Sequence, residues 1–297
     1  MSHARSGLPS LYLAIFLLAL TGLFAKLIPL DAVSIIQLRG VFAAIGLALF
    51  ALLRKRNFWL PSIRAYAGVY GLGILLGVHW VTFFHAMQIS SVAVGMLALF
   101  SYPMITILLE PFFTKQRINT GDIFAGVVMF VGLTVMVGQG LTDPQGPITQ
   151  GVLWGVFSAM LFALRNLIQK YHFQEVASES LMFHQVVAVA VMLAVVVDYS
   201  TVRMLTATDV FKIILLGIFS TAIAHTLLVF SLKQLSAKSV SLISCLQPVI
   251  ATFLAWYFVK EIPGVSILIG GGLVLSVAAY ESVKKSSPDK FKALPLK

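Results

Sequence analysis

The chain has 297 residues, of which 59% are hydrophobic and 11% are charged, and its net charge is +10. A soluble globular domain usually carries about a quarter charged residues, so this composition excludes that class. The mean hydropathy of +0.96 agrees with an integral membrane protein. A single cysteine, Cys245, excludes an intrachain disulfide and has no metal-ligand spacing around it. We therefore expect no metal site and no cofactor.

Ten apolar segments approach or exceed the roughly 20 residues that a helix needs to cross the hydrocarbon core. They occupy residues 10–29, 32–53, 66–87, 91–113, 120–138, 149–170, 178–197, 209–231, 239–259 and 264–282. The first follows Arg5 and mimics a signal peptide, but it lacks a small-residue cleavage site, so we expect an uncleaved span. The sequence predicts an all-α membrane protein with ten transmembrane helices.

The basic residues are distributed unevenly over the predicted loops. With ten spans, the side that holds both termini carries 15 of the 21 lysines and arginines, and the opposite side carries Lys26, Arg203, Lys212 and Lys260. The positive-inside rule then places both termini in the cytoplasm of a plasma-membrane protein. The positive charge therefore indicates topology, and we expect no nucleic-acid partner.

The two halves of the chain repeat. Residues 19–26 align with residues 163–170 at an offset of 144, and Pro103 aligns with Pro248 at an offset of 145. Because each half has five spans, the second half enters the membrane inverted, as in many secondary transporters. We expect one five-helix repeat over residues 1–140, an inverted one over 149–285, and a cytoplasmic tail over 286–297.

Each half carries a proline within a long apolar run, at Pro103 and Pro248. A proline inside a helix removes a backbone hydrogen bond and bends the helix. Matching interruptions in two halves indicate the binding site of a transporter, with the two prolines as hinges. The alternative is a pair of packing kinks with no role in binding.

The chain resembles the EamA branch of the drug/metabolite transporter superfamily over essentially its whole length. The resemblance is carried by Arg39, Pro103, Pro248, the pair Lys260-Glu261 and the glycines 270–272. The family pattern places a glutamate 13 residues after each proline; Glu261 fits, whereas Gln116 stands at the first position. The resemblance implies export of small metabolites, such as amino acids, through a central cavity.

Five polar or aromatic side chains lie in the middle of central spans of both halves. They are His79, Trp80, Tyr102, His225 and Gln247. An aromatic wall with a few hydrogen-bonding groups suits an amphipathic or aromatic organic solute. The alternative for each residue is a hydrogen-bonded packing role, but their shared depth favours a cavity.

Other polar side chains also lie within the predicted spans. Burying a polar side chain in lipid costs free energy, so we expect each of them to have a structural or functional role. Arg39 either binds a substrate carboxylate or satisfies carbonyl groups of a neighbouring helix. We expect Arg165 to extend to the cytoplasmic interface, and Asn166 to bridge helices or face the cavity. Trp154 either closes the cavity or lies in the outer interfacial belt.

Glu110 is the one acidic residue that we place well inside a predicted span, close to the inner end of the fourth, whereas Asp122 and Asp209 fall at span ends. A midplane carboxylate for proton transfer is therefore absent, and coupling would have to use a histidine or Glu110. Facilitated exchange or weakly coupled export agrees with the sequence at least as well.

Small residues at helical spacing predict close helix contacts at Gly73 and Gly77 and at Gly151 and Gly155. The glycines 270–272 predict packing of the last span against a neighbouring span or against a second subunit, in a homodimer.

Taken together, the sequence predicts a secondary transporter that exports a small organic metabolite, such as an amino acid, by alternating access. One alternative is a polyspecific drug or metabolite exporter, or an importer, of the same fold. An intramembrane enzyme is a second alternative, although motifs for a nucleophile, a zinc site or a phosphate loop are missing. A third is a scaffold whose cavity never alternates.

Overall fold

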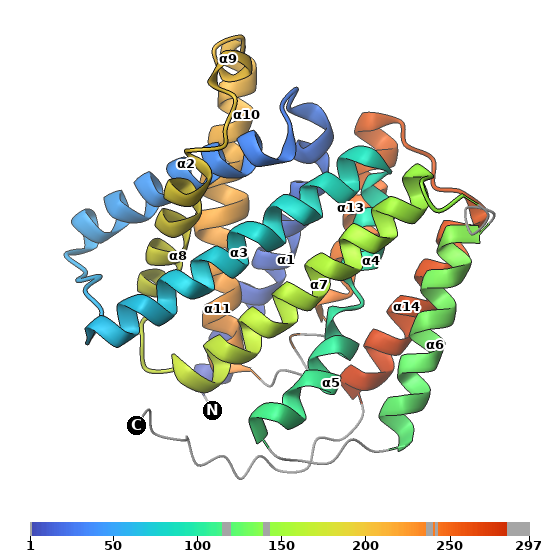
Figure 1. The fold of residues 1–297 in the computed structure, drawn as a ribbon. Helices are drawn as coiled ribbons and strands as arrows, with labels where there is room; N and C mark the ends of the chain where they lie inside the picture. The colour runs from blue at the N-terminus through green and yellow to red at the C-terminus, as the bar shows by residue number, and fades with distance from the viewer. Residues whose placement is uncertain (1, 115–119, 139–142, 236–239, 241–242, 284–297) are drawn as a thin grey trace.

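The computed structural model describes residues 2–114, 120–138, 143–235, 240 and 243–283 (Figure 1). Over these residues the chain is helical and contains no strand. Six helices are long and apolar enough to cross a membrane, and shorter apolar helices occupy the other four predicted spans. The helical membrane architecture is confirmed, and the count of ten crossing helices stays a prediction. Gln116 and the predicted tail 286–297 lie outside the described residues.

The first half contains α1 (Ser2–Leu27), α2 (Ala32–Arg54), α3 (Ile63–Ile89), α4 (Val92–Leu99), α5 (Tyr102–Thr114) and α6 (Thr120–Val137). Short polar side chains start three of these helices. Asp31 caps α2 by accepting from the backbone N–H groups of the next turn, and Ser62 and Ser91 do the same for α3 and α4. Such caps satisfy N–H groups that a helix start leaves free.

The second half contains α7 (Pro147–His172), α8 (Ser178–Leu193), α9 (Tyr199–Val202), α10 (Ala207–Gly217), the π-helix η2 (Ile218–Ile223), α11 (Ala224–Gln234), α13 (Leu246–Leu254), the π-helix η3 (Ala255–Val259) and α14 (Val265–Val283). The segments α10, η2 and α11 form one rod through residues 207–234. Its start carries a capping box between Thr206 and Asp209.

Helices of one half pack mainly on helices of the other half, as Figure 1 shows for α3 beside α7 and for α6 beside α14. α3 packs against α7 and α8, whereas its counterpart in the second half, the α10–α11 rod, packs against α1 and α2. The counterparts α2 and α8 pack on each other. This exchange of neighbours is what a two-fold relation between the halves produces, and it brings the central spans of both halves together.

Large apolar side chains cover outward faces of the bundle. Leu53 is 83% exposed, Phe112 82% and Phe130 71%. Water would penalise such a surface, whereas lipid tails solvate it. The core between the halves is closed by fully buried side chains such as Trp80, Phe84 and Ile35.

The prediction of a bend at each proline is replaced in the structure by a helix break just before each proline. α4 ends at Leu99 and α5 begins at Tyr102, so Pro103 is the second residue of a new helix. Pro248 is likewise the third residue of α13, directly after a turn at Cys245. A first-turn N–H has no partner within its helix, so proline is tolerated there. Each break therefore precedes its proline.

Close glycine contacts are confirmed between α3 and α8 and between α4 and α7. A Cβ atom on Gly73 would lie 2.5 Å from Ala188 Cβ and 2.9 Å from the Gln185 carbonyl oxygen. A Cβ atom on Gly155 would lie 2.5 Å from Ala98 Cβ. Gly270 approaches the backbone of α6 in the same way, so the last span packs against a neighbouring span.

Gly73→Ala should destabilise the protein by about 1–3 kcal/mol, because the added methyl group forces α3 away from the α8 backbone. Gly71→Ala is the matched control on the same helix, since a Cβ atom there meets nothing within 4 Å. Thermal unfolding of the purified protein in detergent checks this prediction. Equal melting temperatures for the two variants would contradict the close α3–α8 contact.

Candidate functional site

A small closed cavity of about 40 Å³ lies between the two halves. A space of this size holds one or two water molecules. Its lining comes from both halves and comprises Leu18, Thr21, Arg39, His79, Trp80, Phe83, Leu99, Phe100, Tyr102, Phe162, His225, Leu228, Ser244 and Gln247. The cavity thus gathers six of the eight residues that the sequence singles out, namely Arg39, His79, Trp80, Tyr102, His225 and Gln247.

Arg39 is the charged residue of this cavity and is 1% exposed. Its Nε donates to Thr221 Oγ1 at 2.8 Å, and its guanidinium carbon lies 4.1 Å from the centroid of the Trp80 ring. Its two terminal nitrogens are buried and find no hydrogen-bond partner among the described residues. None of the described residues that line the cavity is acidic. A buried cation with free donors and no counter-charge is costly unless an anion joins it.

The π-helix η2 positions the one hydrogen-bond partner of Arg39. Thr221 donates its hydroxyl hydrogen to the carbonyl oxygen of Leu216, five residues earlier, at 2.8 Å. That bond leaves the hydroxyl oxygen free to accept from Arg39. Thr221 was not among the predicted site residues. The polar pair Ser220-Thr221 in the middle of an apolar run could have indicated it. π-Helical turns often occur at functional sites.

His79 links the two halves beside the cavity. Its Nδ1 lies 2.7 Å from Ser158 Oγ, and Ser158 donates to the His79 carbonyl oxygen at 2.8 Å. The imidazole ring stacks on Phe162 with centroids 4.8 Å apart, and Phe162 meets Tyr102 edge-on at 5.0 Å. Hydrogen bonds and aromatic contacts therefore join α3, α5 and α7 around one side of the cavity.

Other side chains that line the cavity are less fully bonded. The ring of His225 lies 5.1 Å from that of Trp80, and its Nδ1 is buried without a partner among the described residues. Thr21 Oγ1 is buried without one as well. Together with Arg39, these side chains offer three unused polar groups around one small space.

Arg165 does not reach the cytoplasmic interface as predicted; it is 1% exposed. Its Nε and one terminal nitrogen both donate to Gln185 Oε1, at 2.9 and 2.6 Å, and its other terminal nitrogen donates to Asn166 Oδ1 at 3.1 Å. Gln185 in turn donates to Gln169. This polar network between α7 and α8 satisfies the guanidinium, which removes the need to extend to water.

Two predicted site residues are not brought to the cavity. Asn166 bonds Arg165 within the α7–α8 network. Trp154 is 37% exposed, and its ring meets His85 edge-on at 5.5 Å. Glu110 also lies away from the cavity. Its Oε1 lies 3.1 Å from Lys170 Nζ and accepts a hydrogen bond from the Tyr171 hydroxyl at 2.5 Å.

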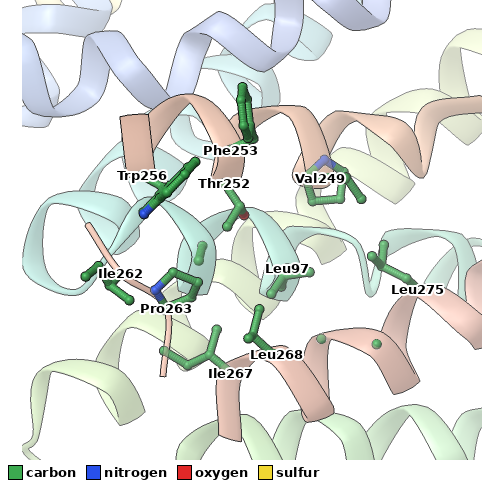
Figure 2. A pocket seen from close by; sticks show the side chains of 14 residues that line it. Leu97, Val249, Thr252, Phe253, Trp256, Ile262, Pro263, Ile267, Leu268 and Leu275 are labelled. Atoms are coloured by element: carbon green, nitrogen blue, oxygen red, sulfur yellow. The ribbon is translucent and has the colours of Figure 1, made fainter. Parts of the chain in front are cut away.

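A larger hollow of about 480 Å³ lies between α13 and α14, over α4 (Figure 2). Figure 2 shows Phe253 and Trp256 on one wall and Leu268 and Leu275 on the other. Thr252 and the Trp256 indole supply the only polar side-chain atoms of its lining. Such an apolar surface groove has too few polar groups to orient a solute, so the smaller central cavity is the better candidate site.

Comparisons with known proteins agree with this architecture. The family model for EamA-like transporters matches residues 5–138 and 149–280. The uncharacterized transporter YxxF of Bacillus subtilis is 23% identical over 72% of this chain and 68% of its own length. An S-adenosylmethionine uptake transporter of Rickettsia felis is 25% identical over 82% of this chain and 80% of its own. A solved protein structure has the same fold, with a TM-score of 0.65 over 94% of this chain and 97% of that one, at 17% identity.

Thr221→Val should destabilise the protein by about 1.5–3 kcal/mol, because it leaves the buried guanidinium of Arg39 without its acceptor. Thr226→Val is the matched control, since the Thr226 hydroxyl is buried without a partner among the described residues. That control should be neutral or stabilising. Melting temperatures of the two purified variants test this, and an equal loss in both would contradict the role of Thr221.

Proposed function

Because the chain belongs to the EamA-like transporter family and is a multi-pass membrane transporter, we propose that it moves a small organic solute by alternating access through the central cavity. A space of about 40 Å³ is too small for such a solute. Within this proposal, the small cavity would represent a closed state between outward-open and inward-open states. Substrate would bind as one half tilts against the other and the cavity widens.

The observation that carries the proposal is the unpaired guanidinium of Arg39. Its two free nitrogens are arranged to bind the two oxygens of a carboxylate, which is the geometry that arginine recognises best. Arg165 provides the contrast, because every one of its nitrogens already has a partner. We infer a substrate that bears a carboxylate, bound at Arg39.

The rest of the lining suits the organic body of that substrate. Trp80, Tyr102 and Phe162 offer aromatic faces, and His225, Gln247 and Thr21 offer hydrogen-bonding groups. An amino acid or a related metabolite fits this combination. His79 also lines the cavity, and Ser158 holds its Nδ1.

Export of such a metabolite is the first candidate, and uptake is the second. Uptake is supported by the Rickettsia relative, an S-adenosylmethionine uptake transporter whose substrate carries both a carboxylate and an aromatic base. The described cavity residues include no carboxylate that could bind a coupling cation. Proton coupling, if present, would have to use His79 or His225 of this lining, and facilitated movement or exchange agrees with the lining at least as well.

The proposal includes a membrane arrangement. All ten apolar segments would cross the plasma membrane as two inverted five-helix repeats, over residues 1–140 and 149–285, with both termini in the cytoplasm. The exchange of helix neighbours between the halves supports the repeat, and the distribution of basic residues supports the orientation.

Transport by the purified protein in proteoliposomes tests the function. Radiolabelled amino acids and S-adenosylmethionine are offered for uptake and for efflux, and at least one should cross faster than in empty liposomes. Trp80→Ala and Tyr102→Ala should lower the rate at least about tenfold, since each removes an aromatic wall of the site. Trp154→Ala is the matched control and should keep the rate. Wild-type rates in both cavity variants would show that the solute takes another route.

Carboxylate recognition is tested on the unmodified protein. Each transported acid is compared with its primary amide as a competitor, and the amide should compete at least about tenfold more weakly, because it loses the charge-assisted bonds to Arg39. Arg39→Lys should reduce this preference, since lysine cannot form the two-pronged contact. Equal competition by acid and amide would overturn the assignment of Arg39.

A further inference from the structure

Two ion pairs join the halves of the chain, one toward each end of the cavity. Lys26 Nζ on α1 lies 3.0 Å from Glu261 Oε1, which follows η3. Lys170 Nζ on α7 lies 3.1 Å from Glu110 Oε1 on α5. In the first pair the lysine belongs to the first half, and in the second pair it belongs to the second half.

The two lysines occupy equivalent positions in the repeat, 144 residues apart. Leu18 lies eight residues before Lys26, and Phe162 lies eight residues before Lys170, and both line the central cavity. Eight residues of α-helix span about 12 Å. Each lysine therefore stands about two turns beyond the cavity on its own helix.

The pairs lie at opposite ends of the bundle. Pro147 and Ile148, at the start of α7, line one small hollow together with Glu261, whereas Lys170 lies 23 residues further along the same helix. That separation corresponds to about 34 Å of helix, close to the ~30 Å hydrocarbon thickness of a bilayer. Figure 1 agrees, because α1 leads into α2 at the top of the view and α7 leads into α8 at the bottom.

Each carboxylate has a second donor that holds it in place. Glu261 Oε2 accepts from the Val92 N–H at 2.8 Å, and Lys26 also donates to the Ser90 carbonyl oxygen at 3.2 Å. This set ties the end of α1 and the residues after η3 to the junction of α3 and α4. At the other end, the Tyr171 hydroxyl donates to the same oxygen of Glu110 that binds Lys170.

The acidic partners explain a departure from the family pattern. Glu261 stands 13 residues after Pro248, whereas the equivalent position after Pro103 is Gln116. Glu110, six residues earlier, supplies a carboxylate to the lysine equivalent to Lys26. The charge pairing is thus kept at both ends although the motif residue is not.

We propose that Lys26–Glu261 and Lys170–Glu110 are the two latches of the transport cycle, each closing one end of the cavity and opening while the other stays closed. This inference rests on the proposed function. Both latches are closed here, in agreement with the small closed cavity. The lysines keep 19% and 33% of their side-chain surface exposed. Ion pairs that water reaches are weak, so each latch opens readily.

The test measures access to the cavity from each side of the membrane. Ser244 lines the cavity, so Ser244→Cys in a Cys245→Ala background places one thiol there. A membrane-impermeant maleimide is applied to intact cells and to inverted vesicles. Glu261→Gln and Glu110→Gln each remove a charge and keep an oxygen acceptor for the second donor.

Each neutralised latch should expose the cavity from its own side only. Glu261→Gln should raise labelling about two- to fivefold from the Lys26 side, and Glu110→Gln by a similar factor from the Lys170 side, since a partly exposed ion pair shifts a population by about that much. With both termini in the cytoplasm, the Lys26 side is external. Lys233→Gln is the control, because Lys233 bonds Val176 within the second half, and it should change neither side.

The outcomes separate this inference from the function itself. If the thiol labels from both sides before any latch is changed, the cavity alternates; if neither side labels and no solute is transported, the proposed function fails. If the cavity alternates but the two glutamine variants leave labelling unchanged, or expose the same side, the latches are wrong. Opposite-sided increases in the two variants would support them.

Discussion

The candidate site of this protein depends on one buried charge, the guanidinium of Arg39. Among the described residues, Arg39 lies against aromatic side chains, has Thr221 as its hydrogen-bond acceptor and keeps two nitrogens without a partner. Stacking on Trp80 offsets part of the cost of removing the guanidinium from water, but no described carboxylate lining the cavity neutralises it. The protein thus keeps an incomplete ion pair at the junction of its halves. Under the proposed function, a carboxylate-bearing solute would complete it, and the site would select its ligand without holding one permanently.

The exchange of helix neighbours determines where that charge lies. Because α3 and the α10–α11 rod each pack against the opposite half, the cavity receives side chains from both. Under the proposed cycle, a tilt of one half against the other would therefore change the cavity and open one Lys–Glu pair while the other stays closed. Close glycine contacts, such as that of Gly73 on α3 with α8, hold the helices of the two halves together, and the helix breaks before Pro103 and Pro248 lie near the site.

Much of the candidate site followed from the depth of polar residues within apolar runs. His79, Trp80 and Tyr102 were predicted to meet His225 and Gln247, and the structure places them around one cavity. Position within the predicted span did not distinguish the roles of the two arginines, because the side chains of Arg165 and Arg39 are both buried. Their roles differ through partners on other helices: Gln185 lies beside Arg165, whereas Arg39 meets aromatic rings. Nor did it reveal Thr221, whose orientation depends on a π-helical turn.

The sequence by itself determined that the chain is a helical membrane protein with two related halves, because partition into lipid depends on the summed hydropathy of about 20 residues and a repeat survives as a constant offset. The tertiary structure decided which polar groups meet, since a hydrogen bond depends on the rotation of each helix about its own axis and on its partner's depth. Asn166 and Trp154 show this, because each makes its contacts away from the cavity, Asn166 with Arg165 and Trp154 with His85. The rotation of α2 likewise leaves two nitrogens of Arg39 without a hydrogen-bond partner among the described residues.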